Sequence, residues 1–193
     1  MRDHLGRLAA IGAALLLAAA GGCRTVKMST PQQRQDLTEA IIGEWAEPAR
    51  LLAAKLIEEY GPPDRVEPSR LVWNDKHLWK KISVWDGIPG SGPEEGAYLL
   101  EQTVSYPVPA QKRPDLAAFS DDIRVSGDGA ELSARSVSED RNFLAVNLAD
   151  EIVQGIKTPA EARRFYDMTL LLKAAGKSSE FTQGLLFLPR PRP

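Results

Sequence analysis

The sequence is poor in the side chains that metal sites and nucleophilic enzymes most often use. Its 193 residues include one cysteine, Cys23, and two histidines, of which only His77 lies beyond residues 1–22. A histidine-rich zinc site or a cysteine–histidine nucleophile therefore cannot be assembled from the rest of the chain. A single cysteine also gives no intramolecular disulfide, so the stability of the fold must come from packing.

The chain also lacks the excess of basic residues that is typical of nucleic-acid-binding proteins. Its formal net charge is -2 and its pI is about 5.8, so we expect no nucleic-acid partner. Hydrophobic residues make up 43% of the sequence and charged residues 26%, which is enough for a real core and an ordinary surface. This composition predicts a globular protein.

The common catalytic motifs are missing as well. No G-x-S-x-G elbow accompanies His77, which lies beside a predicted turn. The loop sequence "GSGPEEG" has the wrong glycine spacing for a phosphate-binding loop, and residues 121–131 lack the spacing of an EF-hand. Carboxylate pairs for glycoside cleavage could be drawn from Glu94, Glu95, Glu101 and the aspartates of residues 121–131, but nothing in the linear sequence selects a pair. We expect no catalytic residues, no metal and no cofactor.

The N-terminus has the layout of a secretory signal. Arg2 and Arg7 are followed from Leu8 by the uncharged run "LAAIGAALLLAAA", which matches a basic region and a short apolar region before a cleavage site of small residues. The run is well short of the roughly 20 residues that a transmembrane helix needs. We therefore predict a signal peptide over residues 1–22.

The lone cysteine refines this prediction. The stretch "AGGC", which ends at Cys23, resembles the lipobox of bacterial lipoproteins, although Ala20 stands where leucine is usual. The resemblance implies that Cys23 is acylated, as by palmitate, and becomes the first mature residue. Arg24 is not the aspartate that tends to retain lipoproteins in the inner membrane. We expect a lipidated tether over residues 23–30, attached to the outer membrane and facing the periplasm.

Beyond the tether, the sequence predicts a single α+β domain over residues 31–188, followed by a solvated tail, disordered, over residues 189–193. "TPQQ" and "TPAE" have the pattern of helix starts at Thr30 and Thr158, and Ser136 with Glu139 predicts a third. Strands grouped between helices favour an antiparallel sheet of two hairpins and further strands, packed by N-terminal and C-terminal helices. The expected helices are 31–43, 48–60, 136–155 and 158–176, and the expected strands lie within 70–87, 97–106, 122–136 and 180–189.

The first hairpin holds the residues that we single out for binding. A turn centred on Asp75 and Lys76 would pair Trp73 with Leu78 and would leave Trp79, Lys81 and Trp85 together on the less apolar face. Tryptophans beside a lysine on an open sheet face could stack on glycan or bind a partner protein. The alternative interpretation is that a helix covers this face. Trp79, Lys81 and Trp85 are our candidate partner-binding site.

Residues 51–84, a helix followed by "YGPPD" and a tryptophan-bearing hairpin, faintly resemble the small lipoprotein of the β-barrel assembly machinery. This resemblance implies only that a tethered α+β module of this size can act as a scaffold. Our first expectation is a non-catalytic envelope lipoprotein that binds an envelope protein or peptidoglycan. The alternatives are a carboxylate-dependent cell-wall hydrolase and a carrier of a lipid or other apolar ligand.

Overall fold

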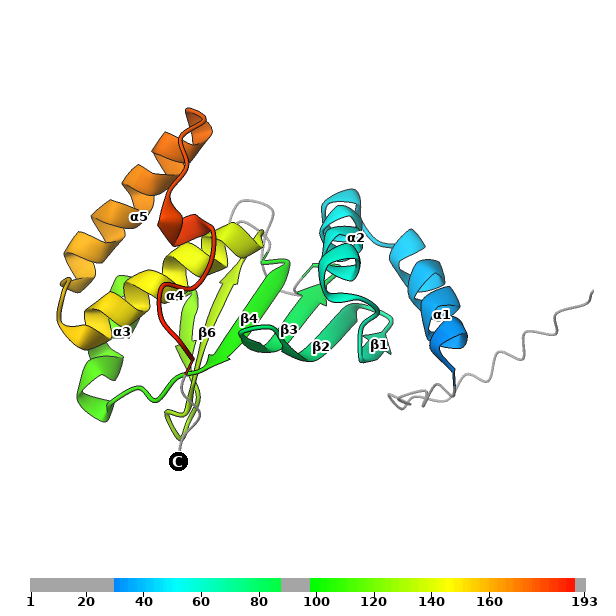
Figure 1. The fold of residues 1–193 in the computed structure, drawn as a ribbon, viewed down its shortest axis with the longest axis horizontal. Helices are drawn as coiled ribbons and strands as arrows, with labels where there is room; N and C mark the ends of the chain where they lie inside the picture. Colours follow the sequence, from blue (N-terminus) through cyan, green and yellow to red (C-terminus); the bar gives the residue numbers. More distant parts are fainter. Residues whose placement is uncertain (1–29, 88–97, 190–193) are drawn as a thin grey trace, which may run out of the picture.

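A computed structural model describes residues 30–87 and 98–189 of the protein. It confirms the α+β class, with the described helices and strands ordered along the chain as follows (Figure 1). They are α1 (Pro31–Gly43), α2 (Glu47–Tyr60), β1 (Arg65–Glu67), β2 (Arg70–Lys76), β3 (Trp79–Trp85), β4 (Leu100–Ser105), α3 (Arg113–Phe119), β5 (Ile123–Val125), β6 (Glu131–Ser136), α4 (Glu139–Gln154) and α5 (Pro159–Ala174), with short 3-10 turns at Ala110–Lys112 and Glu180–Thr182 (η2). The predicted signal peptide, Cys23, most of the tether, the "GSGPEEG" loop and the last four residues lie outside the described ranges.

The six strands form one antiparallel sheet in the order β1-β2-β3-β4-β6-β5. Because β2 with β3 and β5 with β6 are consecutive in sequence, both predicted hairpins are confirmed. Strand β4 lies between them and joins the two hairpins into one sheet.

One face of the sheet forms the core. Helix α2 packs on β2 and β3, and α4 packs on β4 and β6 (Figure 1). The strand residues on this face are fully buried and almost all apolar: Leu71, Trp73, Ile82, Val84, Leu100, Gln102, Val104, Leu132 and Ala134. The Trp73 Nε1 donates a hydrogen bond to the Gly61 carbonyl at 2.8 Å, so the end of α2 is fixed to the middle of β2.

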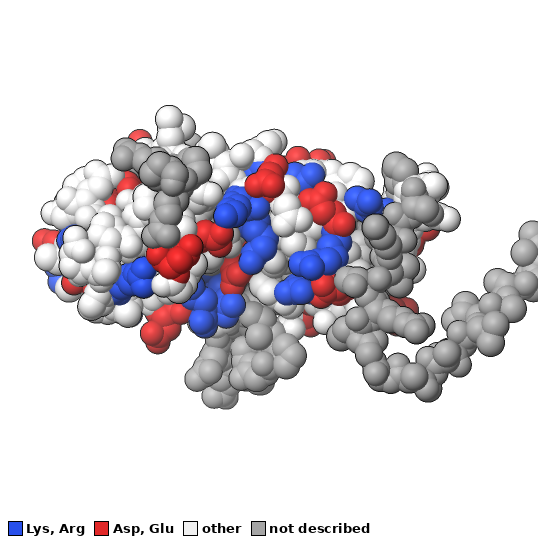
Figure 2. Space-filling view, turned by 90° about the horizontal axis from the view of Figure 1, so that it is seen from below, with Lys and Arg blue, Asp and Glu red and all other residues white. Residues whose placement is uncertain are grey.

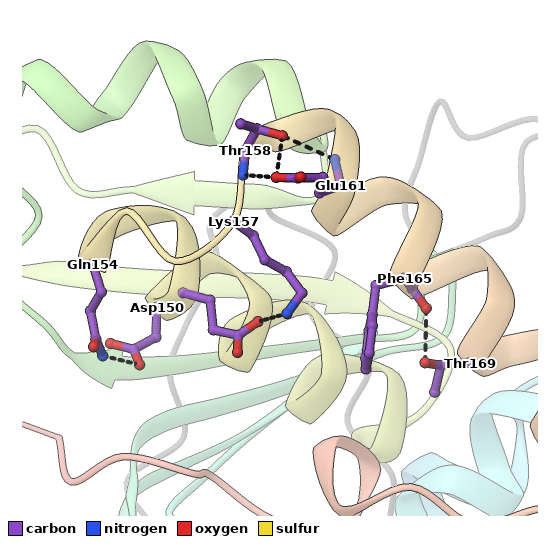
Figure 3. Close-up of polar contacts among 8 residues, drawn as sticks. Asp150, Gln154, Lys157, Thr158, Glu161, Phe165 and Thr169 are labelled. Atoms are coloured by element: carbon purple, nitrogen blue, oxygen red, sulfur yellow. Dashed lines mark hydrogen bonds and ion pairs between the residues drawn. The ribbon is translucent and has the colours of Figure 1, made fainter.

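Several predicted helix ends are confirmed by their caps. The Thr30 hydroxyl accepts a hydrogen bond from the Gln33 amide at 3.3 Å at the start of α1. At the start of α5, Thr158 and Glu161 form the predicted capping box (Figure 3). Gly155 ends α4 with a left-handed φ of 76°, which glycine adopts without steric cost.

The register of the first hairpin differs from the prediction by four residues. Trp73 lies opposite Ile82, not Leu78, and the turn is formed by His77 and Leu78. Asp75 and His77 have φ angles of 50° and 53°, a region in which aspartate and histidine are enriched. The core decides the register, because Ile82 is fully buried opposite Trp73 whereas Leu78 stays 43% exposed in the turn.

Two further predictions are wrong. The N-cap of α4 is Ser138, not Ser136, and the Glu139 side chain points into the core instead of capping the helix. The stretch 180–189 is not a strand but an irregular segment lying along α4. The buried Asn147 side chain donates to the carbonyls of Phe181 and Gly184 at 3.1 and 2.8 Å and accepts from the Leu186 amide at 2.8 Å. These three bonds replace the ladder that a strand would need.

Candidate functional site

The structure separates the three residues of the predicted binding site. Trp79 is 2% exposed and lies under α4, where its ring stacks on Phe143 with centroids 5.1 Å apart. Its Nε1 donates to Glu139 at 2.9 Å. The prediction that Trp79 shares an open face with Lys81 and Trp85 is therefore wrong, and the alternative of a covering helix holds for Trp79 alone. The side-chain alternation of β3 is broken next to Trp79. Lys80 forms an ion pair with Glu131, which lies on the face of the sheet opposite α4.

Trp79 belongs to a buried polar junction around the Glu139 carboxylate. Glu139 Oε1 accepts hydrogen bonds from Tyr60 at 2.6 Å, from Trp79 and from Gln102, which itself accepts from Asn142 at 3.0 Å. The junction joins the end of α2, the hairpin, β4 and the start of α4. Because a carboxylate that is 5% exposed needs hydrogen-bond donors to offset its lost hydration, this arrangement has a sufficient structural explanation.

The junction also changes the acid–base properties of its neighbours. Burial, and then the hydrogen bond to Glu139, raise the pKa of the Tyr60 hydroxyl well above its ordinary value of 10.0. Burial and the nearby Glu139 charge raise the pKa of Glu59 above 4.5. Both shifts favour the neutral form. Tyr60 therefore stays a hydrogen-bond donor throughout the physiological pH range.

Lys81 and Trp85 remain together on the face opposite α2 and α4. Lys81 lies in register with Asn74 on β2 and with Thr103 on β4, and Trp85 lies opposite Arg70. We call this side of the sheet, formed by the strand residues whose side chains point away from α2 and α4, the open face. Figure 2 shows the molecule from below. In this view, Lys and Arg side chains form an irregular band across the surface, and acidic side chains are interspersed among them.

The open face carries more cations than carboxylates, although the whole chain is slightly acidic. By strand register, or by contact for Lys80, the face holds six cations and three carboxylates: Arg65, Arg70, Lys80, Lys81, Arg124 and Arg135, with Glu67, Glu101 and Glu131. A surplus of positive charge on one face attracts anionic ligands.

Ion pairs use only part of this charge. Arg70 donates two hydrogen bonds of 3.0 Å to Glu67, which lower the pKa of that carboxyl below 4.5. Lys80 pairs with Glu131 at 2.5 Å, and Arg135 pairs with Glu101. Other pairs on the face involve the same carboxylates. Lys81 and Arg124 make no ion pair among the described residues.

The sequence analysis missed part of this site. The row that begins with Asn74 and Lys81 continues through Thr103 and Ser133 to Arg124 on the outer strand β5. The Thr103 and Ser133 hydroxyls are 2.9 Å apart and hydrogen-bonded. The alternation of residues 123–136 indicated which of these side chains share a face, but only the pairing of β4 with β6 brings the two hairpins into one row.

Three of the surface cavities in the described part of the chain are small. One of about 190 Å³ lies between α5 and residues 177–182, one of about 180 Å³ includes Arg135 and Tyr166, and one of about 280 Å³ includes Tyr106 and Asp150. Glu139 lines none of these three. In residues 30–87 and 98–189, no three histidine, cysteine or acidic side chains are grouped so that they could hold a metal ion.

No helix within the described ranges is long and apolar enough to cross a membrane. Comparison with protein-family models, with curated proteins and with solved structures gives no significant match. The candidate site therefore rests on the geometry and charge of the open face.

Proposed function

We propose that the protein is a lipid-anchored, non-catalytic binding module of the bacterial cell envelope. Cys23 in "AGGC" would carry the lipid that holds it at the outer membrane, and the open face would bind an envelope partner from the periplasmic side. The observation that carries the proposal is the joint placement of Lys81 and Trp85 on a cationic open face. A charged, aromatic-bearing sheet face opposite a closed core is well suited to binding.

The two alternatives have less support in the described part of the chain. A cell-wall hydrolase would need a pair of carboxylates beside a cleft. The buried Glu139 carboxylate instead accepts hydrogen bonds from three donors and lines none of the three cavities. A carrier of an apolar ligand would need a pocket of roughly 300 Å³ or more. The three cavities have volumes of about 180 to 280 Å³.

The proposed anchor is tested by expressing the full chain and its Cys23→Ser variant in a Gram-negative host. The measurements are metabolic labelling with palmitate and separation of inner and outer membranes. We expect the wild-type chain to take up label and to fractionate with the outer membrane, and both properties to be lost with serine. A wild-type chain that takes up no label would contradict the anchor.

A further inference from the structure

We infer that the open face binds a linear carboxylated glycan that lies across the strands from β3 to β5. The inference rests on the proposed binding function and names the chemical class of its ligand. Its contacts would be Lys81, Ser133 and Arg124 in one cross-strand row. Trp85 lies on the same face of β3, four residues or about 13 Å from Lys81.

The row has the geometry of a receptor for an extended ligand. Lys81 and Arg124 lie on β3 and β5, with β4 and β6 between them. Three strand spacings of about 4.8 Å place their backbones roughly 14 Å apart. Arg124 is exposed, Lys81 and Ser133 are half-buried, and Thr103 between them is buried. A ligand with carboxylates at intervals along its length can therefore contact a cation at each end of the row.

Within residues 30–87 and 98–189, the cations of this row are not ion-paired, in contrast to those of the neighbouring rows. Arg70, Lys80 and Arg135 each have a carboxylate partner on the face. Lys81 and Arg124 have none among the described residues. Binding an anion here would neutralise two cations without breaking an existing ion pair.

The side chains between the cations favour a glycan over an acidic polypeptide. Protein interfaces depend on buried aromatic or aliphatic anchors, but the exposed large hydrophobic residues of the described chain all lie outside the six strands. Between its two cations the row instead offers the Ser133 hydroxyl, which is hydrogen-bonded to Thr103. Hydroxyl groups can hydrogen-bond sugar hydroxyls.

The inference is tested by titrating the full chain with three defined polymers of matched length: oligogalacturonate, oligoglutamate and neutral dextran. Isothermal titration at low and high salt measures the affinities. We expect oligogalacturonate to bind more tightly than oligoglutamate, dextran not to bind, and the affinity to fall with added salt. The double substitution Lys81→Glu with Arg124→Glu should weaken binding by about tenfold or more.

The matched control is Arg50→Glu with Lys55→Glu, because both residues are exposed on α2 and the change in net charge is the same. This control should bind like the wild-type chain. Equal weakening in both double variants, tighter binding of oligoglutamate, or no binding of oligogalacturonate would each overturn the inference. A wild-type chain that takes up no palmitate label but binds oligogalacturonate would contradict the anchor and still support the ligand site.

Discussion

The two faces of the sheet use the same strands for different purposes. On the face under α2 and α4, the fully buried strand residues, which run from Leu71 on β2 to Ala134 on β6, are all apolar except Gln102. On the open face, most strand positions are hydroxyl-bearing or charged, and the exceptions are Val72, Asn74 and Trp85. Lys81 and Arg124 lack ion-pair partners among the described residues. An antiparallel sheet can fold with only one apolar face packed on the core. The residues of its other face can therefore serve binding.

The largest difference between the faces should appear when tryptophan is removed from each. Trp73→Ala removes a fully buried ring and its hydrogen bond to Gly61, and should lower the free energy of unfolding by about 3–5 kcal/mol. Trp85→Ala on the open face should lower it by less than about 1 kcal/mol. Urea unfolding followed by circular dichroism measures both. Equal losses would mean that the open face is as much a part of the core as the other.

A second test removes the polar group that the core contains. Glu139→Ala leaves the donors of Tyr60, Trp79 and Gln102 without their acceptor, and should cost about 3 kcal/mol of unfolding free energy. Glu131→Ala removes the carboxylate that pairs with the exposed Lys80, and should cost at most about 1 kcal/mol. Urea unfolding of the two variants compares them. A Glu139 variant as stable as the Glu131 variant would contradict the structural role of the junction.

A third test separates the C-terminal segment from the sheet. Asn147→Ala removes the three hydrogen bonds that hold residues 181–186 against α4, and should cost about 2 kcal/mol. Hydrogen exchange should accelerate at the Leu186 amide while the β3 and β4 amides stay protected. Gln154→Ala, which removes a bond to Asp150 on the same helix, is the control. Unchanged exchange at Leu186 would contradict the clamp.

The smallest expected effect is a pH-dependent one on the open face. Hydrogen bonds from Arg70 hold the pKa of Glu67 below 4.5, so the charged form is favoured in the folded state. The pair therefore stabilises the fold above about pH 4.5, and this contribution disappears as the pH falls through the lower folded-state pKa. Arg70→Met should cost a few tenths of a kcal/mol at pH 7 and less at pH 3. A cost that is the same at both pH values would contradict the pairing.

Local patterns in the sequence predicted much of this fold. Thr30, Thr158 with Glu161, and Gly155 carry their signals within a few residues, because caps depend on neighbouring backbone groups. The strand predicted within residues 97–106 also follows from a local pattern. These elements and the α+β class followed from the sequence without knowledge of the contacts between distant segments.

The errors arose where distant segments decide the outcome. Trp73 pairs with Ile82 because both side chains are buried in the core. Glu139 turns inward because Tyr60 and Trp79, from other elements, donate hydrogen bonds to it. The candidate site was predicted only in part. Lys81 and Trp85 share the open face as predicted, but Trp79 does not, because its position depends on α4. Arg124 joined the row only through the pairing of β4 with β6.

The most direct measurement of the central claim is a map of backbone amide chemical shifts during titration of the full chain with oligogalacturonate. The account predicts that shifts move at Lys81, Ser133 and Arg124 and at neighbouring open-face residues of β3, β4, β5 and β6, while the amides of α2 and α4 stay in place. Changes concentrated on α4, α5 or residues 180–189 would contradict the claim that the open face is the binding surface.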